Sequence, residues 1–274
     1  MLGALYGDIV GSRFEFTGFN YYRFFMFSPL CTFTDDSLMT LAVADALIKT
    51  KDDRSNYQQV LIKSMKYIAH IYPNVSWGSR FRNWLFYDKE SKPYNSYGNG
   101  SAMRISPVGW VCDSLEETIE LSRLTTEITH NHPEGIKGAE AVAVAIYMSR
   151  KCASREHIKQ AMIKYYPELE TMSIQGLKAS GYGLDREGKW ETCQGSVPQA
   201  ICAFLESKNF EDAIRKAISL GGDSDTQACI TGSIAEAFYG LTERDEQTVM
   251  NFLPKDLQTI YFDFKELLAK TKHR

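Results

Sequence analysis

The spacing of apolar residues along the chain is helical almost throughout, and this limits the fold more than any other feature. In residues 35–50 apolar side chains recur every three or four positions, and Thr34 or Asp35 suits the N-cap. Residues 133–150 begin at Pro133, and their middle is apolar on all sides, as expected of a buried central helix. The two-residue alternation typical of strands is nearly absent. The sequence therefore predicts an all-α fold, a compact orthogonal bundle of many helices.

Further helical patterns cover most of the remaining chain. They lie at about 55–73, 114–128, 154–165, 168–180, 197–207, 209–219, 225–239, 244–251 and 255–270. The segment from about 72 to 113 is the least regular and is rich in Gly, Ser, Asn and aromatic residues. Because long irregular segments inside a compact helical domain are often functional, we expect this one to contribute to a site.

Length and composition favour one domain with a sizeable core. The chain has 274 residues, 44% of them hydrophobic, and no Pro- or Ser-rich linker divides it, so we expect residues 1–274 to form a single domain. The net charge of -3 gives no global basic surplus for nucleic acid or an anionic membrane. The six cysteines form no CxxC pair, which indicates reduced and mostly buried thiols rather than a zinc site.

Neither a signal peptide nor a membrane span is predicted. The N-terminal stretch lacks a basic region followed by a long apolar run. The longest apolar stretch, residues 141–148, is too short to cross a bilayer. We therefore expect a soluble cytoplasmic protein, and we expect it to be a monomer.

Two acidic clusters stand far apart in the sequence, each where an irregular segment enters a predicted helix. Their members are Thr34, Asp35 and Asp36 in FTDDS, and Asp223, Asp225 and Thr226 in GGDSDT. Either cluster alone can be an N-cap, because Asp and Thr accept hydrogen bonds from the free N–H groups of a helix start. A cap needs only one oxygen acceptor, however, and each cluster offers two acids and a hydroxyl.

Taken together, the clusters predict a site for hard cations. Two ionised carboxylates buried side by side need a compensating charge. Five or six oxygen ligands without Cys or His suit Mg²⁺, Mn²⁺ or Ca²⁺ rather than zinc. If the fold brings the two helix starts together, they could hold two cations that share a carboxylate. Such a site can bind a diphosphate-bearing substrate, orient a water or polarise a sugar oxygen.

A glycine-rich segment, SYGNGSAMR, could bind an anion. Gly98 and Gly100 flank Asn99, and Ser101 follows. Closely spaced glycines let backbone N–H groups approach a phosphate without interference from Cβ atoms. The alternative is an ordinary Asn-Gly turn.

Two histidines, His130 and His132 in THNHPEG, stand just before the helix that begins at Pro133. One of them can be a capping or packed histidine. Two histidines two positions apart make a poor zinc signature. A hydrogen bond to a ribose hydroxyl or a phosphate is the functional alternative.

The first fifteen residues combine a glycine ridge with two acids. Gly3, Gly7 and Gly11 have the spacing that lets another helix pack very close. Asp8 and Glu15 do not fit that explanation. Glu15 stands between two phenylalanines, and an apolar lining could raise its pKa and fit it for proton transfer or a gating contact.

Residues 76–84, SWGSRFRNW, alternate aromatic and basic side chains. They can form a plug in the core. They can also form an aromatic wall for an adenine ring, with an arginine near phosphates.

The order GALYGDIVGSRFE, FTDDS, GNGSAMR, THNHPEG and GGDSDT resembles the ADP-ribosylglycohydrolase family from about residue 1 to 240. Each motif is weak alone, but five in this order are specific. The resemblance implies an all-α fold with a central cleft and a binuclear site for Mg²⁺ or Mn²⁺. By position, the two acidic clusters resemble the family's two metal-binding groups, and Glu15 resembles its acidic residue near the metals.

The resemblance also implies which residues bind the substrate. The segment from Gly98 to Met103 matches the loop that holds the diphosphate and ribose. His130 matches the substrate-contacting histidine and is therefore ranked above His132. The positions expected to contact the substrate are Gly98, Asn99, Gly100, Ser101, Met103, His130 and His132.

The reaction implied by the resemblance is hydrolysis at the anomeric carbon of the distal ribose, which releases ADP-ribose from a modified protein or a small conjugate. Two Mg²⁺ or Mn²⁺ ions would bind the ribose hydroxyls and a water. Asp36 or Asp225 would orient or deprotonate that water, and Glu15 would help to position the substrate. An oxocarbenium-like transition state would suit the nearby carboxylates. Arginine is the expected acceptor on family frequency alone, with serine and small conjugates as alternatives.

Three rival interpretations are weaker. DSDT is similar to the DxDxT of aspartyl-phosphate phosphatases, but the preceding residues form a helical pattern rather than a strand. An EF-hand loop starting at Asp223 would need Gly at position 6, where Ala228 stands, and Glu at position 12. A module that binds ADP-ribose without turnover would not need the intact acids.

Overall fold

Helices make up nearly all of the regular structure in the computed structural model, which describes residues 1–184 and 189–271. Within these residues no strand forms, and the only β-pairing is an isolated antiparallel bridge between Gly98 and Thr192. The prediction of an all-α fold is confirmed.

The helices follow one another with short connections, apart from the segments 15–34 and 87–99. In chain order they are α1 (Leu2–Gly11), the 3₁₀ helix η1 (Ser12–Phe14), α2 (Asp35–Lys49), α3 (Tyr57–Ile71), α4 (Ser79–Phe86), α5 (Gly100–Met103), α6 (Ser106–Val111), α7 (Leu115–Glu127), α8 (Pro133–Arg150), α9 (Arg155–Ile163), η2 (Pro167–Glu170), α10 (Ile174–Ala179), η3 (Lys189–Glu191), α11 (Cys193–Leu205), α12 (Phe210–Ile218), α13 (Ser224–Tyr239), α14 (Glu243–Met250) and α15 (Lys255–Thr271).

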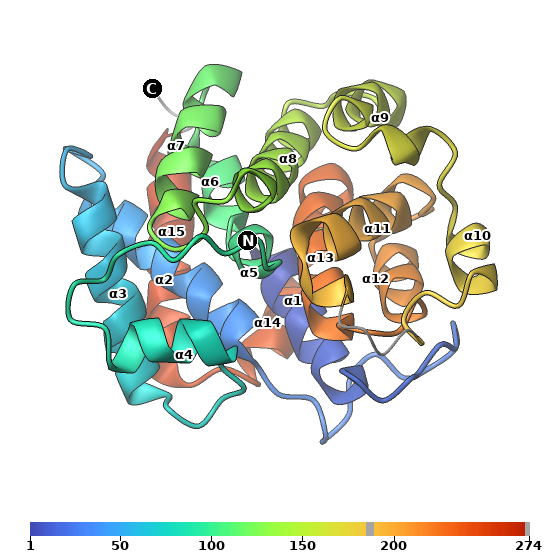
Figure 1. Cartoon of the computed structure of the whole chain (residues 1–274), viewed down its shortest axis with the longest axis horizontal. Coiled ribbons are helices and arrows are strands. Elements are labelled where there is room, and N and C mark those ends of the chain that lie inside the picture. Colours follow the sequence, from blue (N-terminus) through green and yellow to red (C-terminus); the bar gives the residue numbers. More distant parts are fainter. Residues whose placement is uncertain (185–188, 272–274) are drawn as a thin grey trace.

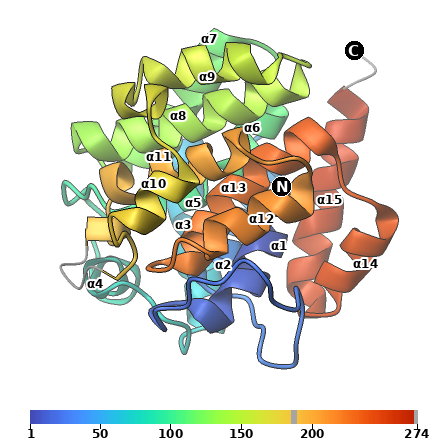
Figure 2. The same ribbon diagram turned by 90° about the vertical axis from the view of Figure 1, so that its right-hand side faces the viewer.

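Two helices, α1 and α13, form the centre of the molecule (Figure 1). They pack against each other along their length, and α2 contacts the other side of α1. Helices α8, α11 and α12 pack around α13, while α3 and α15 pack against α2. Figure 2 shows α14 and α15 on one flank, α10 and α11 on the other, and α12 between them. The starts of α2 and α13 are thereby brought to the end of α1.

The glycine ridge explains how close α1 and α13 come. A Cβ atom added to Gly7 would lie 2.0 Å from the carbonyl oxygen of Ala228. One added to Gly3 would lie 2.1 Å from the carbonyl oxygen of Gly232, and one added to Gly11 would lie 2.5 Å from the Cα of Asp225. Only glycine allows this contact, so the predicted tight packing is confirmed.

The core is continuous across the helices. One cluster of buried apolar side chains extends from Met1 to Phe264, and it includes the whole stretch from Ala141 to Ile146 in α8. This confirms the prediction that α8 is buried. Burial of apolar surface, worth about 25 cal/mol per Å², is the main term that stabilises such a fold. The extent of the core supports a single domain over residues 1–274, which remains a proposal.

Most predicted helices begin and end within about four residues of the observed ones, α11 among them, but the predictions for 168–180 and 72–113 are wrong. The pattern at 168–180 is not one helix: η2 ends at Glu170, and Ser173 caps a separate α10 by accepting a hydrogen bond from the N–H of Gly176. Helix α11 begins at Cys193 rather than 197, because Thr192 caps it and Pro198 is accommodated inside the helix. The irregular segment 72–113 contains α4, α5 and α6.

Within the described part of the chain, no helix combines the length and the apolar character that a membrane crossing would require. All six cysteines are free, and every one except Cys152 is buried.

Candidate metal centre

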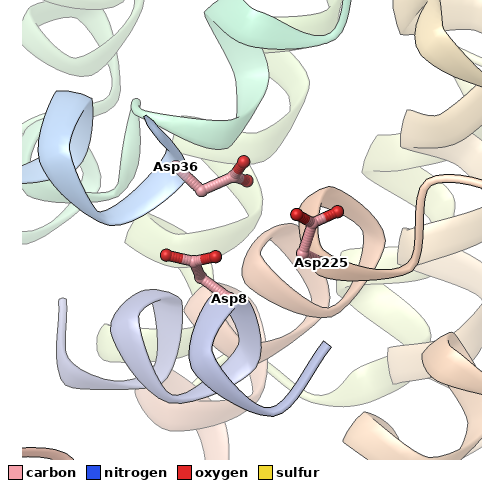
Figure 3. A group of neighbouring side chains, drawn as sticks. All are labelled: Asp8, Asp36 and Asp225. Carbon is pink, nitrogen blue, oxygen red and sulfur yellow. The ribbon is translucent and has the colours of Figure 1, made fainter. Parts of the chain in front are cut away.

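The two acidic clusters of the sequence meet beside the end of α1. Asp36 lies in the first turn of α2, Asp225 in the first turn of α13, and Asp8 near the end of α1. The Thr226 hydroxyl donates to Asp36 Oδ2 at 3.2 Å, although 190 positions separate them. Figure 3 shows the carboxylates of Asp8, Asp36 and Asp225 pointing toward one another from three helices. The two acidic clusters therefore lie close together, which the hypothesis of a shared cation site requires.

Hydrogen bonds to the N–H groups of the helix starts involve Thr34 and one oxygen of Asp225, which accepts from the N–H of Thr226 at 3.0 Å, but not Asp36 or Asp223. Thr34 is the N-cap of α2, and its hydroxyl accepts a hydrogen bond from the N–H of Asp36 at 3.3 Å. Asp223 occupies the N-cap position of α13, but its side chain accepts no capping hydrogen bond. It accepts instead from Asn99 Nδ2 at 2.7 Å. The side chains of Asp36 and Asp223 are thus not used to cap their own helices.

Asp8 joins α1 to the start of α2, a role that the sequence did not reveal. One of its oxygens accepts from the N–H of Thr34 at 2.9 Å and from the N–H of Ser37 at 3.0 Å. The other accepts from the Thr34 hydroxyl at 2.7 Å. An acid within the fully buried helix LGALYGDIVG was a signal for such a role, because a buried carboxylate needs donors or a cation.

The carboxylates form two groups that share Asp225. In each group three ligand oxygens lie within 4.8 Å of one another, which is close enough for a metal ion to be held. The groups are Asp8, Asp36 and Asp225, and Glu15, Asp223 and Asp225. All of these side chains are buried except Glu15, which is partly exposed. Oxygen-only groups of this kind suit Mg²⁺, Mn²⁺ or Ca²⁺.

Asp35 belongs to neither group and is partly exposed. Burial of its carboxyl raises its pKa well above the usual value, and the charges of Asp8, Asp223 and Glu15 raise it further. Asp35 therefore lies within electrostatic range of both groups, and its assignment as a ligand stays a prediction.

Crowding and burial make these acids difficult to ionise without a cation. Burial raises the pKa of Asp36 and of Asp225 well above the usual value, and repulsion by the neighbouring acids adds to this effect. Burial, followed by the charges of Asp223 and Asp8, raises the pKa of Glu15 to about 7. The arrangement therefore favours the binding of positive charge.

No described side chain supplies that charge. Asp36 Oδ1 is buried and has no hydrogen-bond partner. Within residues 1–184 and 189–271, no lysine or arginine forms an ion pair with any acid of the two groups. An orphaned carboxylate oxygen beside two further acids fits a bound divalent cation.

The glycine-rich segment lies next to the second acid group. Asn99 connects them, because its side chain donates to Asp223 and its N–H donates to the carbonyl oxygen of Glu191 at 2.9 Å. The N–H of Gly98 donates to Ser96 Oγ at 3.2 Å. Among the described residues no acceptor is assigned to the N–H groups of Gly100 and Ser101, so these remain available to a ligand.

The side chains of Ser101 and Met103 face the protein interior. The Ser101 hydroxyl donates to the carbonyl oxygen of Gly135 at 2.8 Å, and the residue is fully buried. Met103 is also buried, and its carbonyl oxygen accepts from Cys229 Sγ at 3.3 Å. A contact between these two residues and a substrate stays a prediction, and for Ser101 the backbone N–H is the group that could make it.

The two histidines have different surroundings. His132 is the N-cap of α8, where its Nδ1 accepts from the N–H of Glu134 at 3.1 Å. His130 is buried, and its Nε2 faces the glycine segment: a Cβ added to Gly100 would lie 3.4 Å from it. The capping alternative therefore applies to His132. Substrate contacts of either histidine stay predictions.

The aromatic residues of 76–84 belong to the core. Trp77, Phe81 and Trp84 are all buried, which favours the plug over the adenine wall. Arg80 is exposed and lies over the ring of Tyr94, 5.0 Å from its centroid.

A cavity of about 1050 Å³ lies at the opposite end of α1 and α13, lined among others by Leu2, Arg150 and Glu236. It contains none of the predicted site residues. Volume alone therefore does not mark the acidic centre of this molecule.

Comparison with known proteins gives a family match over most of the chain. The sequence model of the ADP-ribosylglycohydrolase family matches residues 1–256. A structure titled "ADP-ribosylglycohydrolase-related protein complex" shares the fold, with a TM-score of 0.66 over 97% of both chains at 20% identity.

Several curated proteins are similar to this chain in sequence. ADP-ribosylhydrolase ARH3 of Mus musculus is 26% identical over 65% of this chain and 57% of its own length, and the protein of the same name from Bos taurus is 27% identical over 65% and 58%. The chain thus spans little more than half the length of these relatives. ADP-ribosylarginine hydrolase Tri1 of Pseudomonas putida is 25% identical over 88% of this chain and 70% of its own length.

Proposed function

Because this chain belongs to the ADP-ribosylglycohydrolase family, we propose that it is a metal-dependent ADP-ribosyl hydrolase. The reaction is hydrolysis at the anomeric carbon of the distal ribose, which releases ADP-ribose from a modified acceptor. The observation that carries this proposal is the pair of three-acid groups that share Asp225 and include an unpartnered oxygen of Asp36.

Two Mg²⁺ or Mn²⁺ ions are the cofactors that we propose for these groups, and Asp225 would contribute to both positions. The ligands would come from Thr34, Asp35, Asp36, Asp223, Asp225 and Thr226, and the structure adds Asp8 and Glu15 as candidates. When bound, such ions supply positive charge that orients ribose hydroxyls and lowers the pKa of a water.

The carboxylates of the centre then have two tasks. Asp36 or Asp225 accepts a proton from the attacking water: Asp225 belongs to both acid groups, and Asp36 lies beside it in the first. The remaining negative charge stabilises an oxocarbenium-like transition state at the ribose. Glu15, which is partly exposed and belongs to the second acid group, positions the substrate at the edge of the centre.

The glycine segment binds the diphosphate in this proposal. The free N–H groups of Gly100 and Ser101 are the donors, and the absence of a Cβ at Gly100 keeps the space before His130 open. Asn99 fixes this segment to Asp223, so the diphosphate and the reacting ribose are held in a fixed relation.

Arginine is the acceptor that we propose. Tri1, which aligns with 88% of this chain, is named an ADP-ribosylarginine hydrolase. Serine-linked ADP-ribose and small ADP-ribose conjugates are the alternatives. A monomeric state and a cytoplasmic location stay predictions.

The test is release of ADP-ribose from proteins modified on arginine or on serine, measured with Mg²⁺, with Mn²⁺ and with EDTA. We expect release from the arginine substrate that requires a divalent cation and that EDTA stops. Release from the serine-modified protein alone would mean that serine, and not arginine, is the acceptor. Tight binding of ADP-ribose without release from any substrate would mean that the protein is a binding module and not a hydrolase.

A further inference from the structure

A chain of three buried polar side chains lies behind the glycine segment. Arg104 Nη2 donates to the Thr129 hydroxyl at 2.7 Å, and that hydroxyl lies 2.7 Å from His130 Nδ1. The three residues are 1%, 0% and 4% exposed. The sequence pointed to His130 but assigned no role to Arg104 or Thr129.

The direction of these hydrogen bonds follows from the donors available. A guanidinium has only N–H donors, so the Thr129 oxygen accepts from Arg104. Thr129 has one hydroxyl hydrogen, and among the described residues His130 Nδ1 is the one acceptor that lies within reach of it. Nδ1 therefore accepts, and the proton of a neutral imidazole must be on Nε2.

His130 Nε2 is the nitrogen that faces the ligand. A Cβ added to Gly98 would lie 3.7 Å from it, and one added to Gly100 would lie 3.4 Å from it. The other ring nitrogen, Nδ1, is occupied by Thr129, and the ring centroid of Tyr94 is 6.2 Å from that of His130. The one donor of the ring is thus directed at the space before the glycine segment.

We propose that Arg104 and Thr129 are positioning residues that fix His130 as the neutral Nε2–H tautomer, so that it donates a hydrogen bond to an oxygen of the ligand at the glycine segment. That this ligand is ADP-ribose rests on the proposed function. The tautomer itself is a property of the protein alone.

The surroundings keep the ring neutral. Burial lowers the pKa of His130 well below its usual value, and the positive charges of Arg104 and Arg80 lower it further. The neighbouring Tyr94 stays protonated, because burial raises its pKa to about 12. The donor at Nε2 is therefore the same throughout the neutral range of pH.

The proposal also accounts for an otherwise costly feature. Arg104 is a buried cation, and burial lowers its pKa to about 10. In the part of the chain that the structure describes, it forms no ion pair with a carboxylate, and its guanidinium lies 5.7 Å from the ring centroid of Phe81. Leaving a buried charge without a carboxylate is expensive, so a positioning role gives a reason for it.

The experiment reads the tautomer by ¹⁵N NMR of the imidazole rings in the full-length protein at pH 7, with and without ADP-ribose. The wild type is expected to show His130 protonated on Nε2 and unprotonated on Nδ1. Protonation on Nδ1, or an imidazolium, would overturn the proposal whether or not ADP-ribose binds. Failure to bind or hydrolyse ADP-ribose would instead overturn the proposed function and leave the tautomer as it is.

Two variants test the role of Thr129. Thr129→Val removes the hydroxyl, and we expect protonation at Nδ1 to appear and the Kd for ADP-ribose to rise about five- to tenfold, the loss of one hydrogen bond. Thr129→Ser keeps the hydroxyl and should restore both readouts. An Nε2–H tautomer that persists in Thr129→Val would show that Thr129 does not fix it. If that variant does not fold, the wild-type spectrum still shows whether His130 is the Nε2–H tautomer, and Thr129→Ser still tests whether the hydroxyl preserves it.

Discussion

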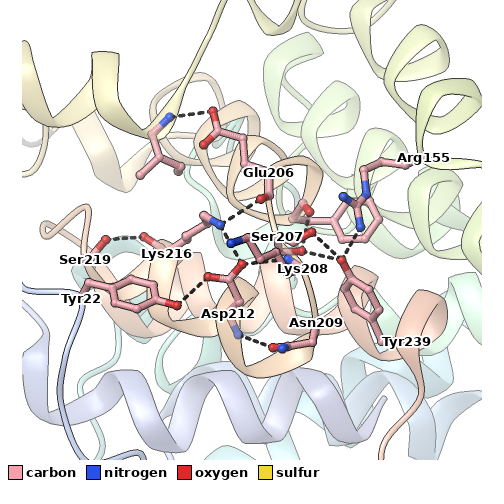
Figure 4. A network of polar contacts seen from close by, with 12 residues as sticks. Tyr22, Arg155, Glu206, Ser207, Lys208, Asn209, Asp212, Lys216, Ser219 and Tyr239 are labelled. Carbon is pink, nitrogen blue, oxygen red and sulfur yellow. Dashed lines mark hydrogen bonds and ion pairs between the residues drawn. The ribbon is translucent and has the colours of Figure 1, made fainter.

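Asp212 and Asp36 are both buried carboxylates in the first turn of a helix, but among the described residues only Asp212 has a basic partner. Asp212 accepts hydrogen bonds from the Tyr22 hydroxyl, the N–H of Lys208 and the ammonium of Lys216, each at 2.7 Å (Figure 4). Asp36 Oδ1 accepts none.

The pKa values of the two carboxyls differ accordingly. Burial alone would raise the pKa of Asp212, but the hydrogen bonds from Lys216 and Tyr22 outweigh it and lower the pKa. Burial raises the pKa of Asp36, and the charges of Asp8 and Asp35 raise it further. The difference separates Asp212, a structural acid whose partners all come from the chain, from Asp36, for which we propose a bound cation as partner.

The largest difference between the two acids should appear in activity. Asp36→Asn removes a candidate ligand and a candidate base, so turnover should fall on the order of a thousandfold or more. Asp212→Asn is the matched change at the structural acid and should keep turnover within about twofold of the wild type at a temperature where it is folded. The measurement is initial rates of ADP-ribose release at saturating Mg²⁺. Equal losses in both variants would remove the distinction.

The acidic centre lies where α1 and α13 are in close contact, because Asp8 is on α1 and Asp225 on α13. Gly7→Ala would place a methyl group 2.0 Å from the Ala228 carbonyl oxygen, and we expect it to lower the free energy of unfolding by about 3 kcal/mol. It should also weaken Mg²⁺ binding, because Asp8 moves with α1. Gly78→Ala has open space and should change stability by less than about 1 kcal/mol. Urea unfolding measures the stability of both variants. A Gly7→Ala protein as stable as the wild type would show that α1 and α13 do not pack this closely.

Stability without a divalent cation should change with opposite sign in the two variants. Asp212→Asn weakens the bonds to three donors and should lower the free energy of unfolding by about 2 kcal/mol. Asp36→Asn removes a charge that repels its neighbours and should raise it by about 1 kcal/mol at pH 8. Urea unfolding in EDTA measures both. A destabilised Asp36→Asn protein would mean that the charge of Asp36 is compensated within the chain.

The two acids also predict opposite dependences on pH. The raised pKa values at the metal centre mean that its contribution to stability is present below about pH 4 and is lost as pH rises, through about 7 for Glu15. The lowered pKa of Asp212 means that its contribution is present above about pH 4 and is lost at lower pH.

Bound Mg²⁺ should prevent the loss of stability that the raised pKa values cause at high pH. We expect the Tm difference between Mg²⁺ and EDTA samples to be about 5 °C at pH 8 and much smaller at pH 5. Thermal unfolding of the wild type at the two pH values measures it. A difference that is equal at both, or larger at pH 5, would show that the acids are not what Mg²⁺ stabilises.

The sequence was most informative where local pattern alone determines structure. Helical periodicity and caps placed α2, α7, α8 and α13 within about two residues. The pattern failed at 168–180, where Ser173 starts a new helix, and at 72–113, where three short helices have too few turns to show a period. The glycine ridge predicted the α1 contact because only a close neighbour requires three such glycines.

Contacts between segments that are distant in the chain could not be predicted from the sequence. The two clusters were visible as motifs, but their meeting depends on α1 lying between α2 and α13. The sequence alone gives Asp8 no structural role, because its hydrogen-bond partners Thr34 and Ser37 lie at the start of another helix. Arg104 and Thr129 are 25 positions apart, and no local pattern links them to each other.

The most direct test of the shared acidic centre is the number of Mn²⁺ ions bound per chain, measured by titration calorimetry and by metal analysis after gel filtration. We expect two ions in the wild type and, because Asp225 belongs to both groups, loss of both in Asp225→Asn. The Asp212→Asn protein is the control and should keep two. A single ion in the wild type, or two ions retained in Asp225→Asn, would contradict a binuclear site built around Asp225.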